Sequence, residues 1–269
     1  MSSKYIVRQP IKDRESKIIG YEIQYHGENQ AFGGDKAAPA NDFAAADTIY
    51  NFLTQNTDKL LRGSLNFMTF TVTLLMKKTP RLFDKNELVI QIDDSVLIHP
   101  LAMHMVQQYV KDGYQVAVNE FQFAPRYLAL LDTINYIKLN IQTTPMLTLK
   151  NIVDIAHSMN KKCIAVGIDQ EDLYQKALSL GVDAMEGTCV AEKLTTKAHS
   201  SGYLQSNFFR LLMSITKDEP DVEEIEQIIS VDATLTYGIL KVVNSCYFAL
   251  RHRVTTVRQA ITIMVLGAL

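Results

Sequence analysis

The chain has few features that would link it to a metal or a membrane. Only three cysteines occur in 269 residues, at positions 163, 189 and 246, and their separation does not match the spacing of metal ligands. Free thiols placed in this way are typical of a reducing cytoplasm. The first residues have no apolar core of a signal peptide, and the longest apolar run, residues 261–269, is too short to span a bilayer. The sequence therefore predicts a soluble, cytoplasmic protein.

An excess of charge of one sign is also absent. The 27 lysines and arginines nearly balance the 29 aspartates and glutamates, which leaves a formal net charge of −2. This balance gives no electrostatic reason to expect a nucleic acid or a membrane surface as a partner. The histidines show no metal-ligand spacing apart from His99 and His104, which we expect on a helix surface. No metal and no cofactor are predicted.

Short strand-like runs alternate with amphipathic segments through most of the chain. The runs are rich in Val, Ile and aromatic residues, as buried strands are, and comprise residues 18–25, 64–70, 88–92, 115–118, 136–139, 163–166 and 182–185. Helical periodicity lies between them, at residues 42–61, 99–111, 125–131, 147–159 and 171–180. Alternation over about seven units favours a parallel sheet closed into a TIM-like (β/α) barrel. An open doubly wound sheet is the alternative, although no Gly-rich phosphate loop follows the first run.

A second, all-helical region is predicted after about residue 200. Helical periodicity is present at residues 207–216, 222–230, 234–243 and 257–266, and the strand signal is lost. We therefore predict a barrel domain over residues 1–199 and an all-α region over residues 200–269. The last helix is apolar on more than one face. We expect this region to be the first part of a larger helical domain, and its apolar patch to be covered by another copy or by the barrel.

Seven short motifs resemble, in order, those of the EAL domain, the barrel that hydrolyses cyclic di-GMP. They are Arg-Gln-Pro-Ile at 8–11 with Gly-Tyr-Glu-Ile-Gln at 20–24, then residues 67–75, 89–94, 113–121, 136–140, 165–169 and 180–187. Together they span roughly residues 4–195. The helical region resembles an HDOD domain, on residues 228–232, 243–245, 259–260 and 266–267. EAL followed by HDOD is the arrangement of the YuxH-like family of signalling proteins.

The resemblance implies a two-metal hydrolase, whose hard divalent cations need anionic oxygen ligands. Three of the positions that would bind metal have changed. Thr69 stands where the family has an Asn, Gln91 replaces the first Glu of Glu-x-x-Glu, and Asn119 replaces the first Asp of an Asp pair. The last two changes replace an anion with an amide of the same shape, so the cations would lose countercharge while packing is kept. A strand aligned out of register is the alternative, but no nearby acid restores all three positions.

Other positions of the implied site are kept in part. Glu22 and Lys138 are retained, Glu120 and Asp169 keep a carboxylate with a one-carbon change in length, and Glu186 replaces a Gln. We expect these positions to be vestigial, with no catalytic role. Without metals, Lys138 is expected to pair with Glu120 or Asp169.

Substrate binding is also expected to be lost. His26 stands where the family places an Arg that grips a phosphate, and an imidazole is shorter and mostly neutral at pH 7. Gln9 is retained from the same implied site, but it could equally serve a structural turn.

The sequence thus favours a non-catalytic signalling scaffold related to cyclic di-GMP phosphodiesterases. Its expected partner is another signalling protein, or a second copy, bound through the helical region. A receptor that binds cyclic di-GMP without cleaving it is the first alternative, and an active phosphodiesterase is the second.

Overall fold

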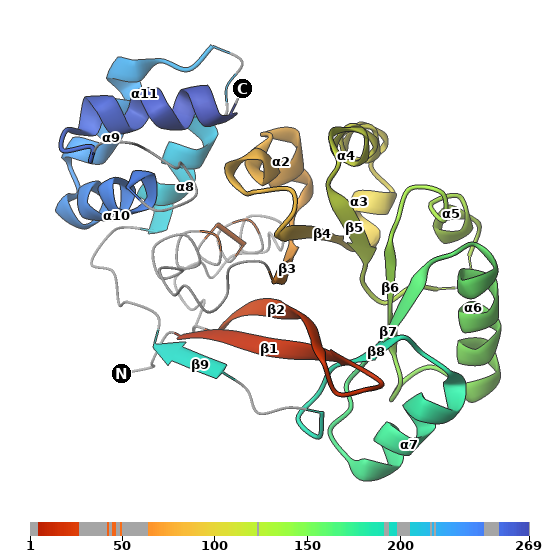
Figure 1. The fold of residues 1–269 in the computed structure, drawn as a ribbon. Helices are drawn as coiled ribbons and strands as arrows, with labels where there is room; N and C mark the ends of the chain where they lie inside the picture. Colours follow the sequence, from red (N-terminus) through yellow and green to blue (C-terminus); the bar gives the residue numbers. More distant parts are fainter. Residues whose placement is uncertain are drawn as a thin grey trace, which may run out of the picture.

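The computed structural model describes residues 5–26, 64–122, 124–190, 194–197, 205–215, 217, 219–244 and 253–268, together with positions 42, 45, 46 and 49 (Figure 1). The predicted helix over residues 42–61 lies mostly outside this part. No helix in the described ranges is both long and apolar enough to cross a membrane.

The predicted barrel is confirmed. Its parallel strands are β2 (Ile18–His26), β3 (Leu65–Thr69), β4 (Leu88–Ile92), β5 (Gln115–Val118), β6 (Tyr136–Asn140), β7 (Lys162–Val166) and β8 (Ala184–Met185). An additional strand, β1 (Tyr5–Asp13), closes the ring because it pairs antiparallel with both β2 and β8. The short β9 (Leu194–Lys197) pairs antiparallel with β1. The open-sheet alternative is thereby excluded.

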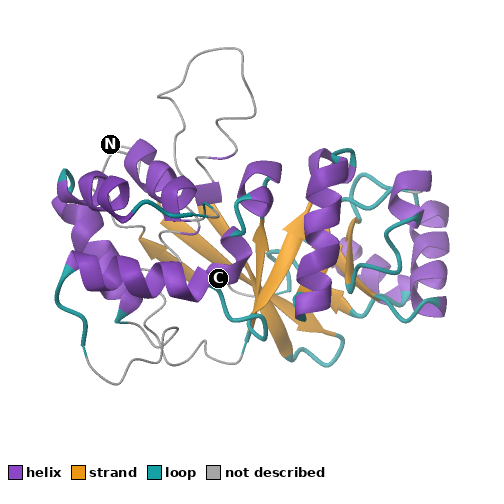
Figure 2. Ribbon diagram, turned by 90° about the horizontal axis from the view of Figure 1, so that it is seen from above, coloured by secondary structure: helices purple, strands orange, loops and turns teal. Residues whose placement is uncertain are grey.

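Helices surround the strands (Figure 2). In chain order they are α2 (Val72–Met76), the 3-10 helix η2 (Thr79–Leu82), α3 (Asp94–Leu97), α4 (Pro100–Asp112), α5 (Pro125–Leu128), α6 (Met146–Ser158) and α7 (Glu171–Leu180). The helices α4 and α7 end at Gly113 and Gly181, whose positive φ angles suit a residue without a side chain. The longer helices lie where periodicity predicts them.

One apolar layer fills the interior of the barrel. Seven strands contribute one buried residue each to it, namely Ile11, Phe67, Val89, Ala117, Tyr136, Ile164 and Ala184. The rings of Phe67 and Tyr136 meet edge to face, with centroids 5.1 Å apart. On β2 the corresponding position is Gly20, where a Cβ would lie 2.9 Å from the Phe67 ring and 2.7 Å from the Leu65 carbonyl oxygen. The layer therefore requires glycine at this position. The apolar layer forms the floor beneath the polar residues at the mouth of the barrel.

The helical region is a group of four helices beside the barrel: α8 (Gln205–Ile215), α9 (Val222–Ser230), α10 (Ala233–Val243) and α11 (Val257–Ala268) (Figure 1). The carboxylates of Asp221 and Asp232 accept backbone hydrogen bonds at the starts of α9 and α10. The Asn244 side chain bonds both the N–H and the carbonyl of Val254, which joins the end of α10 to the segment before α11.

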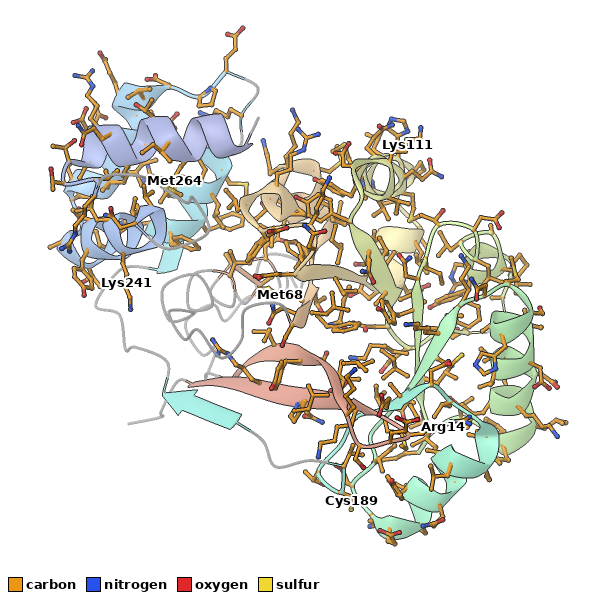
Figure 3. The ribbon with its side chains drawn as sticks, in the orientation of Figure 1. Arg14, Met68, Lys111, Cys189, Lys241 and Met264 are labelled. Atoms are coloured by element: carbon orange, nitrogen blue, oxygen red, sulfur yellow. The ribbon has the colours of Figure 1, made fainter. Side chains whose placement is uncertain are left out.

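The apolar side chains of α11 that the structure describes are covered by the chain itself. Ala260, Ile261 and Met264 are buried. The helix α11, on which Figure 3 labels Met264, contacts α8, α9 and α10 and also η2 of the barrel. The described part of α11 therefore packs on the other three helices and on η2, and coverage of this region by another copy stays a prediction.

Candidate functional site

A cavity of about 640 Å³ opens at the end of the barrel where the parallel strands finish. Its lining includes Asp93 after β4, Asn119 after β5, Gly167 after β7 and Gly187 after β8. This is the face on which (β/α) barrels build their binding sites, because the loops that follow the strands converge there.

The predicted site residues are brought together by the two-residue period of the strands. Each lies two positions from a residue of the apolar interior layer, toward the mouth of the barrel. These pairs are Glu22 after Gly20, Thr69 after Phe67, Gln91 after Val89, Asn119 after Ala117, Lys138 after Tyr136 and Glu186 after Ala184, with Gln9 before Ile11 on the antiparallel β1. The polar layer thus sits directly above the apolar one.

Lys138 is the centre of this polar layer and is only 3% exposed. Its Nζ lies 2.8 Å from Glu22 Oε2 and 2.9 Å from Glu186 Oε2, and it donates a hydrogen bond to Gln91 Oε1 at 3.0 Å. An ammonium group buried to this extent needs such partners because it has lost its water.

Gln91 connects the lysine to the rest of the layer. Its Nε2 donates to Glu22 Oε1 at 3.1 Å and to Thr69 Oγ1 at 3.3 Å, while its Oε1 accepts from Lys138. Asn119 Nδ2 donates to the same Thr69 hydroxyl oxygen at 3.4 Å. A carboxylate at position 91 could not make the bond to Glu22, because it has no proton to donate and carries the same charge. The amide therefore supplies a donor where the two acids would otherwise repel each other.

The pKa values of the two buried glutamates move in opposite directions. Burial raises the pKa of both groups. In Glu22 this effect is outweighed by the charge of Lys138 and by hydrogen bonds from Glu186 and Gln91, which together lower the pKa of Glu22 to about 2. For Glu186, burial outweighs Lys138, and the hydrogen bond to Glu22 adds to the effect, which raises its pKa to about 8. Burial lowers the pKa of Lys138, but the two carboxyl groups raise it further, so it is protonated. Near pH 7 the group holds one ammonium, one carboxylate and one protonated carboxyl, and it is close to neutral.

The other two retained carboxylates lie on the rim and not beside the lysine. Glu120 has a left-handed φ of 50° and is exposed. Asp169 accepts hydrogen bonds from the backbone and hydroxyl of Thr188 and from Gln142. The prediction that Lys138 pairs with Glu120 or Asp169 is wrong, because both acids follow the ends of their strands whereas Lys138 lies within β6 and faces Glu22 and Glu186.

Sequence reasoning missed several residues that line the cavity, namely Asp94, Ser95, Gln122 and Tyr127. Their position after β4 and β5 was the available signal, since loops after barrel strands form this face. Of the substrate positions, Gln9 lines the cavity and is buried. His26 ends β2, and its side chain lies outside the described residues.

A second group of ionisable side chains lies at the opposite end of the strands. Asp183 Oδ2 accepts from the backbone N–H of Cys163 at 2.7 Å and lies 2.9 Å from His157 Nε2. Burial, with the Asp183 carboxylate nearby, raises the pKa of the Cys163 thiol to about 12. The thiol is therefore protonated, and Asp183 joins the end of α6 to the start of β7.

Comparison with protein families agrees with this architecture. The family model of the EAL domain matches residues 53–193, and that of the HDOD domain matches residues 203–268. The chain belongs to the EAL domain family. An HDOD domain follows the EAL domain, as the motifs predict.

Two relatives match over almost the whole chain. YuxH of Bacillus subtilis (strain 168) is 25% identical over 267 residues, which cover 97% of this chain and 64% of YuxH. The cyclic di-GMP phosphodiesterase CdgJ of Vibrio cholerae serotype O1 is 22% identical over 264 residues, covering 97% of this chain and 61% of CdgJ. The chain thus spans less than two thirds of the length of these relatives.

Solved EAL structures share the fold at low identity. The phosphodiesterase PaMucR in complex with cyclic di-GMP aligns with a TM-score of 0.58 at 12% identity, over 71% of this chain and 97% of that one. An EAL domain protein from Listeria monocytogenes aligns with a TM-score of 0.53 at 17% identity, over 85% and 93%.

Proposed function

We propose that this EAL–HDOD protein is a non-catalytic signalling scaffold that does not hydrolyse cyclic di-GMP. The observation that carries the proposal is the arrangement of Lys138 between Glu22 and Glu186, completed by Gln91. In this arrangement the chain's own side chains neutralise the buried charges at the centre of the barrel and satisfy their hydrogen bonds.

The residues present do not fit the pair of divalent cations that the EAL family implies. Both carboxylate oxygens of Glu22 are engaged, one by the Lys138 ammonium and the other by the Gln91 amide. A cation at Glu22 would have to displace these groups. It would then contact the neutral amides of Gln91 and Asn119, which do not offset its charge as anionic ligands would. Hydrolysis through a bound metal pair is therefore not expected in this pocket.

The charge of the pocket also argues against a phosphodiester ligand. Six carboxyl groups and a single ammonium group line the cavity, and that ammonium is already shared by two of the acids. A phosphodiester brings further negative charge to this surface, where like charges at short range are unfavourable.

A scaffold needs a protein partner. From the composition we also infer that the protein is cytoplasmic. The helical region exposes Val231 at 75% and Tyr237 at 70%. Exposed tyrosines are frequent at the centres of protein interfaces because they bury a large area at low entropic cost. A partner signalling protein, or a second copy, would bind here. The relative named as a cyclic di-GMP phosphodiesterase supports the same signalling context.

Isothermal titration with cyclic di-GMP, with and without magnesium, tests the proposal against its first alternative. We expect no saturable heat in either condition for the full chain. Saturable binding at micromolar concentration that needs no metal would favour the non-hydrolysing receptor. Binding that needs magnesium would show that the pocket still assembles a metal centre, and the scaffold proposal would be wrong.

A further inference from the structure

We propose that His157, Cys163 and Asp183 form a binding site for one zinc ion, at the end of the barrel opposite the pocket. The inference does not depend on the proposed function, because none of these residues lines the pocket. Cysteine spacing does not reveal this set, since it combines three residue types from the end of α6, the start of β7 and the residue before β8.

The first support is the distance between the three ligand atoms. Among the described residues, this is the one set of three metal-binding side chains whose ligand atoms all lie within 4.8 Å of one another. The closest measured pair is His157 Nε2 and Asp183 Oδ2, which are 2.9 Å apart. Zinc bonds its ligands at about 2.0–2.3 Å, so tetrahedral coordination spaces neighbouring ligand atoms by roughly 3–4 Å. Adjustment of the side chains alone can therefore bring all three atoms onto one ion.

The second support is that the backbone already holds the ligands together. Asp183 Oδ2 accepts a hydrogen bond from the Cys163 N–H at 2.7 Å, and the Asp183 N–H donates to the Cys163 carbonyl at 2.9 Å. The helix α6, which carries His157, packs against β7 (Figure 1). The turn between them is closed by a bond of 2.8 Å from the Lys161 N–H to the Ala156 carbonyl. Ligands fixed by such outer hydrogen bonds are typical of metal sites.

Burial and charge also suit a divalent ion at this place. Cys163 is buried, whereas the side chains of His157 and Asp183 are 41% and 38% exposed. The ion would therefore contact sulfur on its protein side and keep a fourth position open to a water molecule. When the metal binds, the thiol proton leaves to solvent. One thiolate and one carboxylate then offset the two charges of the ion, and the imidazole is neutral.

The donor set identifies the class of metal. Magnesium and calcium take oxygen ligands almost exclusively, and only one of the three side chains supplies oxygen. Thiolate and imidazole together favour zinc. The alternative is an ordinary ion pair between His157 and Asp183, and such a pair would not involve the Cys163 sulfur. Coordination by this sulfur is therefore the feature that separates the two arrangements.

The test is a titration of the full chain with cobalt(II), which adopts the tetrahedral geometry of zinc and absorbs in the near ultraviolet when bound to a thiolate. The starting protein carries Cys189→Ser/Cys246→Ser, which leaves Cys163 as its only cysteine. We expect thiolate absorption that saturates at one cobalt per chain. Zinc chloride should abolish it by displacement, and magnesium chloride at the same concentration should not.

Variants in the same background locate the site. His157→Gln should raise the dissociation constant for cobalt at least about tenfold, since loss of even an outer partner of a ligand has an effect of this size. Asp183→Asn should do the same, although its amide oxygen can still accept the Cys163 N–H bond and support the fold. The control His104→Gln, at an exposed histidine on α4, should leave the dissociation constant unchanged.

Three results would overturn the inference. An absence of thiolate absorption would show that Cys163 binds no metal and that His157 and Asp183 form an ion pair only. An unchanged dissociation constant in both His157→Gln and Asp183→Asn would place the metal elsewhere. An equal loss of affinity in His104→Gln would mean that the effect is not specific to this cluster.

Discussion

At the residue scale, the pocket depends on the charge of one buried lysine. Lys138 contacts two carboxyl groups and one amide, all of them buried. Removing one member of a buried ion pair leaves its partners without compensation, which costs more than the pair itself contributes.

We predict that Lys138→Met lowers the free energy of unfolding by about 3–5 kcal/mol, because Glu22 is left charged and buried. Urea denaturation measures this loss. The triple variant Glu22→Gln/Lys138→Met/Glu186→Gln should be more stable than Lys138→Met alone, since no charge is left unpaired. Lys150→Met, at an exposed position on α6, is the control and should change stability by less than about 0.5 kcal/mol. Equal effects at positions 138 and 150 would contradict the observed ion pairs.

A second prediction concerns pH. The pKa of Glu186 is raised from 4.5 to about 8 in the folded protein, by burial above all. The folded state therefore holds more protons than the unfolded state between these values, and stability should fall as the pH rises from about 5 to about 8. The expected loss is on the order of 1 kcal/mol or more.

Glu186→Gln should remove this slope, whereas Glu223→Gln on the surface of α9 should keep it. Denaturation curves of the three proteins at several pH values measure the difference. A wild-type slope that persists in Glu186→Gln would mean that another group titrates.

At the scale of elements, the turn after β8 has the least freedom to change. Gly187 lines the cavity at a φ of 158°, and a Cβ there would lie 2.1 Å from the Ile168 carbonyl oxygen. Backbone atoms cannot move aside as the end of a flexible side chain can.

We predict that Gly187→Ala costs at least about 2 kcal/mol and displaces the segment that carries Asp169. The matched control is Gly113→Ala, at the end of α4, where φ is 98° and a Cβ would meet only the Lys85 side chain at 3.4 Å. That change should cost about 1 kcal/mol from backbone strain alone. Thermal unfolding of the two variants makes the comparison, and a milder effect at position 187 than at 113 would contradict the packing described for the turn.

The elements differ in how well the sequence predicts them. The bounds of β4 and β5 follow from short runs in which all residues but one glutamine are apolar. The strand β1 was not predicted, because Arg8, Gln9 and Pro10 interrupt its apolar pattern, and its place between β2 and β8 depends on closure of the ring. Short helices such as α2 and α3 carry too few residues to show a period.

The site was predictable to a similar extent. Positions such as Gln91 and Glu186 follow from motif order, and the two-residue period places them above the interior layer. The partners of Lys138 could not be predicted from the sequence. They are Glu22 and Glu186, which belong to parts of the chain distant from β6 in sequence. The rim contact between Arg126 and Asp94 likewise joins two short helices, α5 and α3, that sequence periodicity does not relate.

At the scale of the whole molecule, the barrel and the helical region meet through α11 and η2, and the pocket opens at the carboxyl ends of the strands. Gln91, Thr69 and Asn119 are joined by hydrogen bonds at the mouth of the barrel. The proposed loss of the metal pair rests on the two neutral amides at positions 91 and 119.

Turnover of cyclic di-GMP tests that account most directly. The full chain is incubated with cyclic di-GMP and either magnesium or manganese, and the linear dinucleotide is measured by chromatography beside a protein-free blank. We predict no product above the blank with either metal, because Gln91 and Asn119 supply no countercharge and Lys138 engages Glu22. Turnover by the wild-type chain that disappears in Glu22→Ala would contradict the account.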